Sequence, residues 1–185
     1  MHMKKLSKGD PVPNFEGTDL RGNRVRLSDF EGQKLMISFY RHAECLFCDL
    51  RLHELLEQYD ELNSPGLRFV AVFQSPLEEA LANEELLQVP FAVIPDPEHI
   101  LYKQFGVTRG SLLGYIIGAL KLNRVFKAFS NSYYIRSGSG NRFLYPADFL
   151  INEDHTIHTA YYANNIASHL SLKAVRMFTR KYKKV

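Results

Sequence analysis

The chain has 185 residues, of which 45% are hydrophobic and 23% are charged, and its formal net charge at pH 7 is +3. This length suffices for one domain with a sizeable core, and so small a charge gives no reason to expect a nucleic-acid partner. Two cysteines are too few for a disulfide scaffold. The N-terminus is not followed by the apolar segment of a secretory signal, which predicts a cytoplasmic location.

The first part of the chain predicts a hairpin and then a buried strand. Gly22-Asn23 is a turn signal between two short extended stretches, residues 14–18 and 24–27. Residues 34–40 form a nearly continuous apolar run, which is typical of a central strand covered on both faces.

Helices and strands then alternate. The expected elements are a helix over 46–62, a strand over 67–73, a helix over 76–88, a strand over 91–94, a helix over 97–105, a hairpin over 146–151 and 156–162, and a closing helix over 167–182. Ser75 is expected to cap the second of these helices, with Pro76 at its first position. The alternation predicts an α/β fold in which a sheet with parallel pairs is flanked by helices.

An apolar helical segment at 111–130 interrupts this alternation, and we expect a single domain, 1–185, with a helical insertion at about 111–145. Gly110, Gly114 and Gly118 recur every four residues and would allow close approach of another helix. The uncharged stretch is far shorter than the roughly 20 residues that a bilayer requires, which predicts no membrane span. Core packing, a homodimer contact and a cover over the active site all remain open for this segment.

The two cysteines, Cys45 and Cys48, lie in a CxxC motif between the buried strand and the helix that follows it. The N-terminus of a helix favours the thiolate, which is the reactive form of cysteine. Two intervening residues leave the sulfurs close enough to form a disulfide, so the pair could exchange two electrons without metal or cofactor. A zinc site would need His42, His53 or a second chain to complete four ligands. Two inert core cysteines are a further alternative.

Several phrases of the sequence resemble the redoxin group, which includes the AhpC/TSA peroxiredoxins and the thioredoxin-like thiol-disulfide oxidoreductases. In chain order they are Gly9-Asp10-Pro11-Val12-Pro13-Asn14-Phe15, Arg26-Leu27-Ser28-Asp29-Phe30-Glu31-Gly32, Phe39-Tyr40, Val89-Pro90-Phe91, Pro95-Asp96-Pro97, Phe105-Gly106-Val107 and Pro146-Ala147-Asp148-Phe149-Leu150-Ile151-Asn152. The resemblance implies a thioredoxin-like fold with a central mixed sheet. It covers most of residues 9–107 and 146–162 and leaves out 111–145.

Around the cysteines this resemblance is mixed. Peroxiredoxins carry P-x-x-x-T/S-x-x-C, and its three defined positions fall here on Arg41, Cys45 and Cys48, of which only the last matches. The R-x-x-x-C-x-x-C pattern is similar to the branch that contains prostamide synthases. Pro146 falls where the family's thioredoxin-like members have a cis-proline facing the disulfide, with the backbone beside it, here Tyr145, helping to dock substrate.

The resemblance implies two mechanisms. In one, the Cys45 thiolate attacks a substrate disulfide and Cys48 resolves the mixed disulfide. In the other, Cys48 attacks a peroxide and Cys45 condenses with the sulfenic acid. Arg41 would stabilise the thiolate and polarise the peroxide, unless it only pairs with Glu44 or Asp49.

Three neighbouring side chains are further candidates for the site. His42 could tune the pKa of Cys45 or pass protons, or it could simply be a partly exposed histidine. Leu46 and Phe47 could form an apolar lip that docks a protein or lipid-like substrate, or could merely pack in the core.

The sequence therefore predicts an oxidoreductase that acts on a disulfide or a peroxide and is regenerated by a protein or small-thiol reductant. The alternative is a non-catalytic redox sensor or adaptor, in which the cysteine pair gates a partner through the 111–145 insertion.

Overall fold

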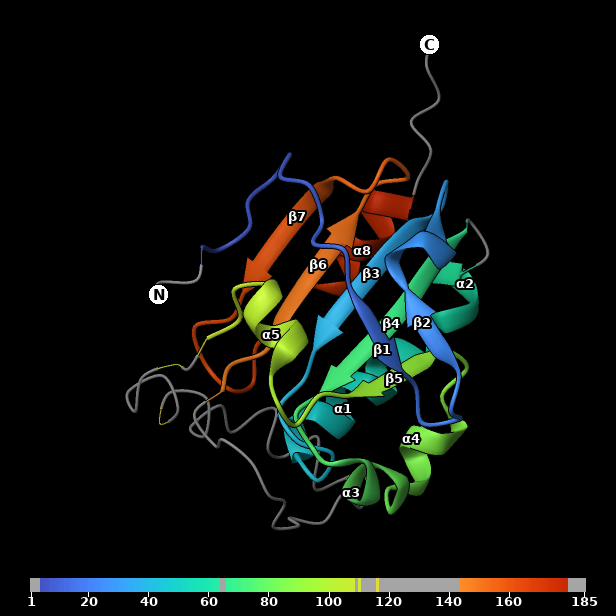
Figure 1. The fold of residues 1–185 in the computed structure, drawn as a ribbon, viewed down its shortest axis with the longest axis vertical. Helices are drawn as coiled ribbons and strands as arrows, with labels where there is room; N and C mark the ends of the chain where they lie inside the picture. Colours follow the sequence, from blue (N-terminus) through green and yellow to red (C-terminus); the bar gives the residue numbers. More distant parts are fainter. Residues whose placement is uncertain (1–3, 64–65, 109, 111–115, 117–143, 180–185) are drawn as a thin grey trace.

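A central five-stranded sheet organises the protein, which we describe from a computed structural model for residues 4–63, 66–108, 110, 116 and 144–179. The strand order is β5-β4-β3-β6-β7 (Figure 1). These strands are β3 (Lys34–Phe39), β4 (Leu67–Phe73), β5 (Ala92–Pro95), β6 (Ala147–Ile151) and β7 (Ile157–Tyr162). β3, β4 and β5 run parallel, whereas β6 and β7 are antiparallel to their neighbours. The predicted mixed sheet is thus confirmed.

The predicted N-terminal hairpin is present as β1 (Glu16–Thr18) and β2 (Arg24–Arg26). Gly22 lies in its turn with a φ of 81°, a left-handed conformation that glycine adopts without steric cost. A 3-10 turn, η1 (Leu27–Phe30), follows and leads into β3.

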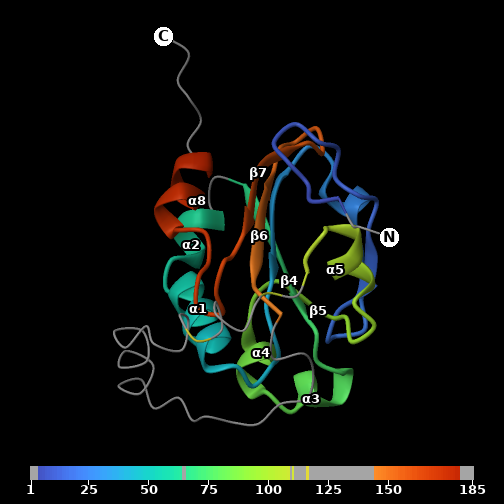
Figure 2. The ribbon, with the colours of Figure 1, turned by 90° about the vertical axis from the view of Figure 1, so that its left-hand side faces the viewer.

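Two layers of different structure cover the sheet (Figure 2). α1 (Leu46–Leu56), α2 (Tyr59–Asn63) and α8 (Leu172–Thr179) lie on one face, and α5 (Ile100–Gln104) with the N-terminal hairpin lies on the other. Each layer encloses its own apolar core cluster. α3 (Leu77–Leu81) and α4 (Glu84–Gln88) lie beyond the carboxyl end of β4 (Figure 1).

The predicted helices are shorter than the hydrophobic pattern suggested. The helix expected over 46–62 is divided into α1 and α2, and the one expected over 76–88 into α3 and α4. The second division occurs because the Asn83 side chain accepts a hydrogen bond from Glu85 N–H and starts a new helix there. The prediction that Ser75 caps α3 was wrong, since its hydroxyl instead accepts a hydrogen bond from Ala43 N–H at 2.8 Å.

The last two predicted helices also begin late. α5 starts at Ile100, where the Asp96 carboxylate accepts hydrogen bonds from the N–H groups of Ile100 and Leu101 at 2.8 Å each. α8 starts at Leu172, because the backbone of Leu170 just before it is bonded to two buried side chains, its N–H to the Asp148 carboxylate and its carbonyl to Arg51.

The predicted insertion at about 111–145 lies almost entirely outside the described residues, so the single domain and the sensor role built on this segment stay predictions. Among the residues that are described, no helix is long and apolar enough to cross a membrane.

Candidate active site

The cysteine motif lies at the carboxyl ends of the parallel strands β3 and β4, where α1 begins. Cys45 is the N-cap residue of α1, with extended backbone, and Cys48 lies in the first turn. The Cys48 N–H donates to the Cys45 carbonyl at 2.7 Å. The predicted order of strand, CxxC and helix is therefore present, and it brings both sulfurs to the electropositive end of the helix.

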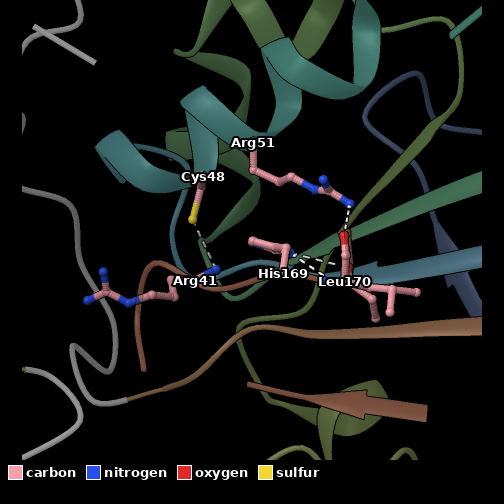
Figure 3. A network of polar contacts seen from close by, with 6 residues as sticks. Arg41, Cys48, Arg51, His169 and Leu170 are labelled. Atoms are coloured by element: carbon pink, nitrogen blue, oxygen red, sulfur yellow. Dashed lines mark hydrogen bonds and ion pairs between the residues drawn. The ribbon is translucent and has the colours of Figure 1, made fainter. Parts of the chain in front are cut away.

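Arg41 contacts both thiols. Both cysteines are free, and only 3% of Cys45 and 1% of Cys48 is exposed. Arg41 Nη1 lies 3.2 Å from Cys45 Sγ. The Arg41 backbone N–H donates to Cys48 Sγ at 3.4 Å, the contact drawn in Figure 3. The guanidinium is itself buried, so its charge acts on Cys45 with little screening by water.

The two thiols differ in acidity. The pKa of Cys45 is held well below its usual value because the Cys48 thiol donates to its sulfur; burial opposes this effect, and the charges of Arg41 and His42 reinforce it. Burial raises the pKa of Cys48, and the neighbouring Cys45 charge raises it further. Of the two thiols, Cys45 is therefore the one that loses its proton more readily.

His42 lies beside the pair and is buried. Its Nδ1 has no hydrogen-bond partner among the described residues. The pKa of His42 is lowered because the ring is buried, and the negative charge of Cys45 only partly opposes this effect. Its predicted roles, tuning Cys45 or passing protons, stay predictions.

The backbone between Arg41 and Cys45 is clamped to the segment that follows β4. The Arg41 carbonyl accepts from Gln74 N–H at 3.0 Å, and Ala43 N–H donates to the Ser75 hydroxyl. The Ala43 carbonyl accepts from Asn83 Nδ2 at 2.5 Å. Ser75 and Asn83 are buried, so these bonds fix the loop that aims Arg41 at Cys45.

The four predicted substrate-binding residues surround this loop in different environments. Leu46 is half-buried, whereas Phe47 belongs to the core cluster under α1. Tyr145 and Pro146 are also buried. A Cβ on Gly110 would overlap the Tyr145 ring, so a larger residue there would require the ring to shift. Whether any of the four contacts substrate stays a prediction.

Pro146 does not have the cis bond that the resemblance implied, because the described residues contain no cis peptide. Its carbonyl accepts a hydrogen bond from Ala163 N–H at 3.0 Å, which continues the pairing of β6 with β7. The expected thioredoxin-like arrangement of a cis-proline beside the CxxC motif was therefore wrong here.

Comparison with known proteins decides the family. The family model described as AhpC/TSA family matches residues 8–160, which is most of the chain. The chain belongs to the AhpC/TSA family. Peroxiredoxin Bcp of Escherichia coli (strain K12) is 33% identical over 107 residues, which cover 57% of this chain and 67% of that protein.

Solved structures support the fold of this AhpC/TSA protein. A mutant of peroxiredoxin 6 of Arenicola marina aligns with a TM-score of 0.70 at 12% identity and covers 94% of this chain and 72% of its own. Peroxidoxin BcpB of Mycobacterium tuberculosis aligns with a TM-score of 0.63 at 17% identity, and the alignment covers 97% of this chain and 99% of that structure's chain. The predicted thioredoxin-like fold and the predicted class, a cysteine-dependent oxidoreductase, are both confirmed.

Sequence reasoning missed one polar pair in this AhpC/TSA protein. Asp148 in β6 is fully buried, and both of its carboxylate oxygens lie 3.1–3.2 Å from His169 Nδ1. The available signal was a carboxylate inside an otherwise apolar strand, which requires a partner. Nothing local pointed to His169, which lies 21 residues later and reaches β6 only through the fold.

Proposed function

We propose that the chain is a thiol peroxidase in which Cys45 is the attacking thiolate and Cys48 is the resolving cysteine. The observation that carries this proposal is the 3.2 Å approach of Arg41 Nη1 to Cys45 Sγ. A guanidinium has five N–H donors in a fixed fork. It can therefore stabilise a thiolate and also polarise a peroxide that reaches the same sulfur.

The first half of the reaction oxidises Cys45. Its sulfur attacks one oxygen of the hydroperoxide, so an S–O bond forms while the O–O bond breaks, and the sulfur gives up two electrons. The departing alkoxide takes up a proton and leaves as an alcohol, or as water when hydrogen peroxide is the substrate. Cys45 is left as a sulfenic acid.

The second half closes and then reopens a disulfide. The Cys48 sulfur attacks the Cys45 sulfur, an S–S bond forms, the S–O bond breaks, and hydroxide leaves with the Cys48 proton as water. A dithiol protein or two small thiols then reduce the disulfide and are themselves oxidised. We place this cycle in the cytoplasm, where such reductants are abundant.

The family motif supports the opposite order, because its attacking cysteine falls on Cys48. The two thiols are equally buried, and it is the raised pKa of Cys48, against the lowered one of Cys45, that speaks against that order in the reduced protein. A disulfide oxidoreductase is the second candidate function. It is favoured by the N-cap position of Cys45, from which the same thiolate could attack a substrate disulfide.

Single replacements of the cysteines test these assignments. We expect the reduced parent protein to consume hydrogen peroxide with a thiol reductant, and Cys45→Ser to remove this activity. Cys48→Ser should consume one equivalent and accumulate a sulfenic acid that dimedone traps. If the two variants exchange these behaviours, Cys48 attacks first. A parent that reduces insulin but consumes no peroxide would be a disulfide reductase, and one with neither activity would overturn the proposed enzyme.

A further inference from the structure

Five buried polar side chains lie on the sheet face that α1 covers, and we call them the buried polar cluster. They are Ser38, Tyr40, Arg51, Asp148 and His169, and none is more than 9% exposed. Ser38 and Asp148 are direct neighbours in the register of β3 with β6. Tyr40 lies two residues beyond Ser38, so its side chain leaves the sheet on the same face.

Part of the cluster is firmly bonded. The Asp148 carboxylate accepts from Leu170 N–H at 2.7 Å besides its contact with His169. Arg51 reaches from α1 to the Leu170 carbonyl, to which Nη2 donates at 2.8 Å (Figure 3). The imidazole is thereby fixed at Nδ1, which leaves Nε2 as its second site for a proton.

Two other atoms of the cluster, Arg51 Nε and His169 Nε2, are buried without a hydrogen-bond partner among the described residues. Ser38 Oγ and Tyr40 Oη make no bond of standard geometry there either, although the two hydroxyls lie near enough for Ser38 to lower the pKa of Tyr40 by hydrogen bonding. Native proteins satisfy such groups, often with ordered water. These four atoms supply both donors and acceptors, which is the mixed set that water requires.

The cluster adjoins Cys48. The Tyr40 ring is stacked on Phe73 at 4.8 Å and lies 5.2 Å from the His169 ring. The residue after Tyr40 donates its backbone N–H to Cys48 Sγ. Burial raises the pKa of Tyr40; Arg51 and a hydrogen bond with Ser38 oppose this effect, and the charges of Asp148 and Cys48 add to it. With His169, these are the charged and titratable groups around the tyrosine.

We propose that the buried polar cluster encloses water and delivers the proton that Cys48 takes up whenever the internal disulfide is reduced. The proposal rests on the proposed function only in that the Cys45–Cys48 disulfide must form. The reducing thiolate attacks Cys45, the S–S bond breaks, and its electron pair goes to the Cys48 sulfur. Because burial disfavours a thiolate there, the His169 imidazolium gives its Nε2 proton through water to that sulfur and keeps the Nδ1 proton that faces Asp148. The neutral imidazole then regains a proton at Nε2 from solvent.

His169→Asn tests the proton delivery. The asparagine amide can still donate to Asp148 from the place of Nδ1, but it has no group that titrates at the place of Nε2. The disulfide is formed with diamide, and its reduction by dithiothreitol is followed by quenched flow. We expect reduction to slow at least fivefold, while oxidation of the reduced variant by hydrogen peroxide changes less than twofold.

His53→Asn is the matched control, because His53 lies on the same helix as Cys48 and contacts a carboxylate, Glu57, at the surface. We expect it to behave like the parent protein. Reduction of the His169 variant at the parental rate would overturn the proposal, even if peroxide turnover is found. Absence of peroxide turnover would instead overturn the proposed function and leave the diamide experiment valid.

Tyr40→Phe tests for the water. If the hydroxyl is bonded to water, its removal should shift the urea midpoint of unfolding to lower concentration, and it should do so in a Ser38→Ala background as well, where the bond to Ser38 is already lost. If the hydroxyl is buried dry and without a partner, the phenylalanine variant should be more stable than the parent. A higher midpoint would therefore overturn the hydrated cluster.

Discussion

The two faces of the central sheet are built differently. The face under α5 is packed with aromatic rings, among them Phe39, Phe105 and Phe149, whose centroids lie 5.1–5.7 Å apart. The face under α1 has an apolar core of its own but also holds the buried polar cluster and both cysteines. One face stabilises the fold, and the other combines packing with groups that can carry charge.

The same strands supply both faces. In β3, Leu35, Ile37 and Phe39 belong to the cluster under α5, whereas Met36 and Tyr40 belong to the one under α1. Since side chains of a strand alternate between faces, one apolar run in the sequence conceals two environments. The buried polar side chains lie on the face that α1 covers. The cysteines on that face are therefore within reach of the N-terminus of α1.

Phe149→Ala would show that the aromatic face serves stability alone. Phe149 is fully buried against the rings of Phe39, Phe105 and Tyr162. Its truncation should lower the free energy of unfolding by about 3–5 kcal/mol, measured in urea. The folded variant should still alkylate Cys45 with the parental pH profile. A changed profile would mean that the two faces are coupled.

Arg41→Gln should have the largest effect on the chemical face without unfolding it. Loss of a charge-assisted hydrogen bond costs about 2 kcal/mol, or roughly 30-fold in the rate of peroxide consumption. The pKa of Cys45, measured by pH-dependent alkylation, should rise. Arg41→Lys should be intermediate, because it keeps the charge and loses the fork. Arg24→Gln, at an exposed arginine paired with Glu16, is the control and should leave both readouts unchanged.

Most of the fold could be predicted from the sequence, since it depends on local signals. The strand Leu67–Phe73 was predicted at both ends, because Gly66 and Ser75-Pro76 bound one apolar run. The break at Asn83 was missed, although asparagine is a common N-cap, because apolar residues continue on both sides of it.

The site could be predicted only in part. Arg41, Cys45 and Cys48 lie within eight residues of one another, so their spacing brings them together once the helix forms. The pairing of Asp148 with His169, and the clamp from Ser75 and Asn83, join segments that meet only in the folded chain. No periodicity or motif reports such contacts, which depend on topology.

Asp148→Asn tests whether the polar face also stabilises the fold, through the dependence of the free energy of unfolding on acid pH. Burial alone would raise the pKa of Asp148, but its ion pair and hydrogen bond with His169 bring that pKa down to about 2. A carboxyl with a depressed pKa stabilises the fold above its unfolded-state pKa, and this contribution is lost as the pH falls through the folded-state value. The parent should therefore lose about 2 kcal/mol between pH 4 and pH 2 from this group.

Urea unfolding at each pH measures this loss. The asparagine variant should have a lower free energy of unfolding than the parent at pH 7. Between pH 4 and pH 2 that free energy should change less than it does in the parent. Glu153→Gln, at an exposed acid on the same hairpin, should keep the parental acid dependence. An unchanged profile in Asp148→Asn would show that the buried ion pair does not contribute to stability.

Asn83→Ser should have the smallest effect and tests the clamp on the active-site loop. Serine can still cap α4, but its side chain is too short to reach the Ala43 carbonyl that Asn83 Nδ2 now contacts. Loss of this one neutral hydrogen bond should cost about 1 kcal/mol in urea unfolding. Because the loop aims Arg41 at Cys45, alkylation of Cys45 at pH 7 should slow about fivefold, which matches that energy.

Ser75→Ala releases the other side of Ala43 and leaves α4 untouched, so it separates the clamp from the helix. If the clamp positions Arg41, both variants should slow alkylation, and the double variant should slow it by less than the product of the two, since either loss frees the same segment. In an Arg41→Gln background neither substitution should slow the alkylation of Cys45 any further, because the guanidinium that the loop positions is gone. Equal slowing in that background would mean that Ser75 and Asn83 support the fold alone and do not act through Arg41.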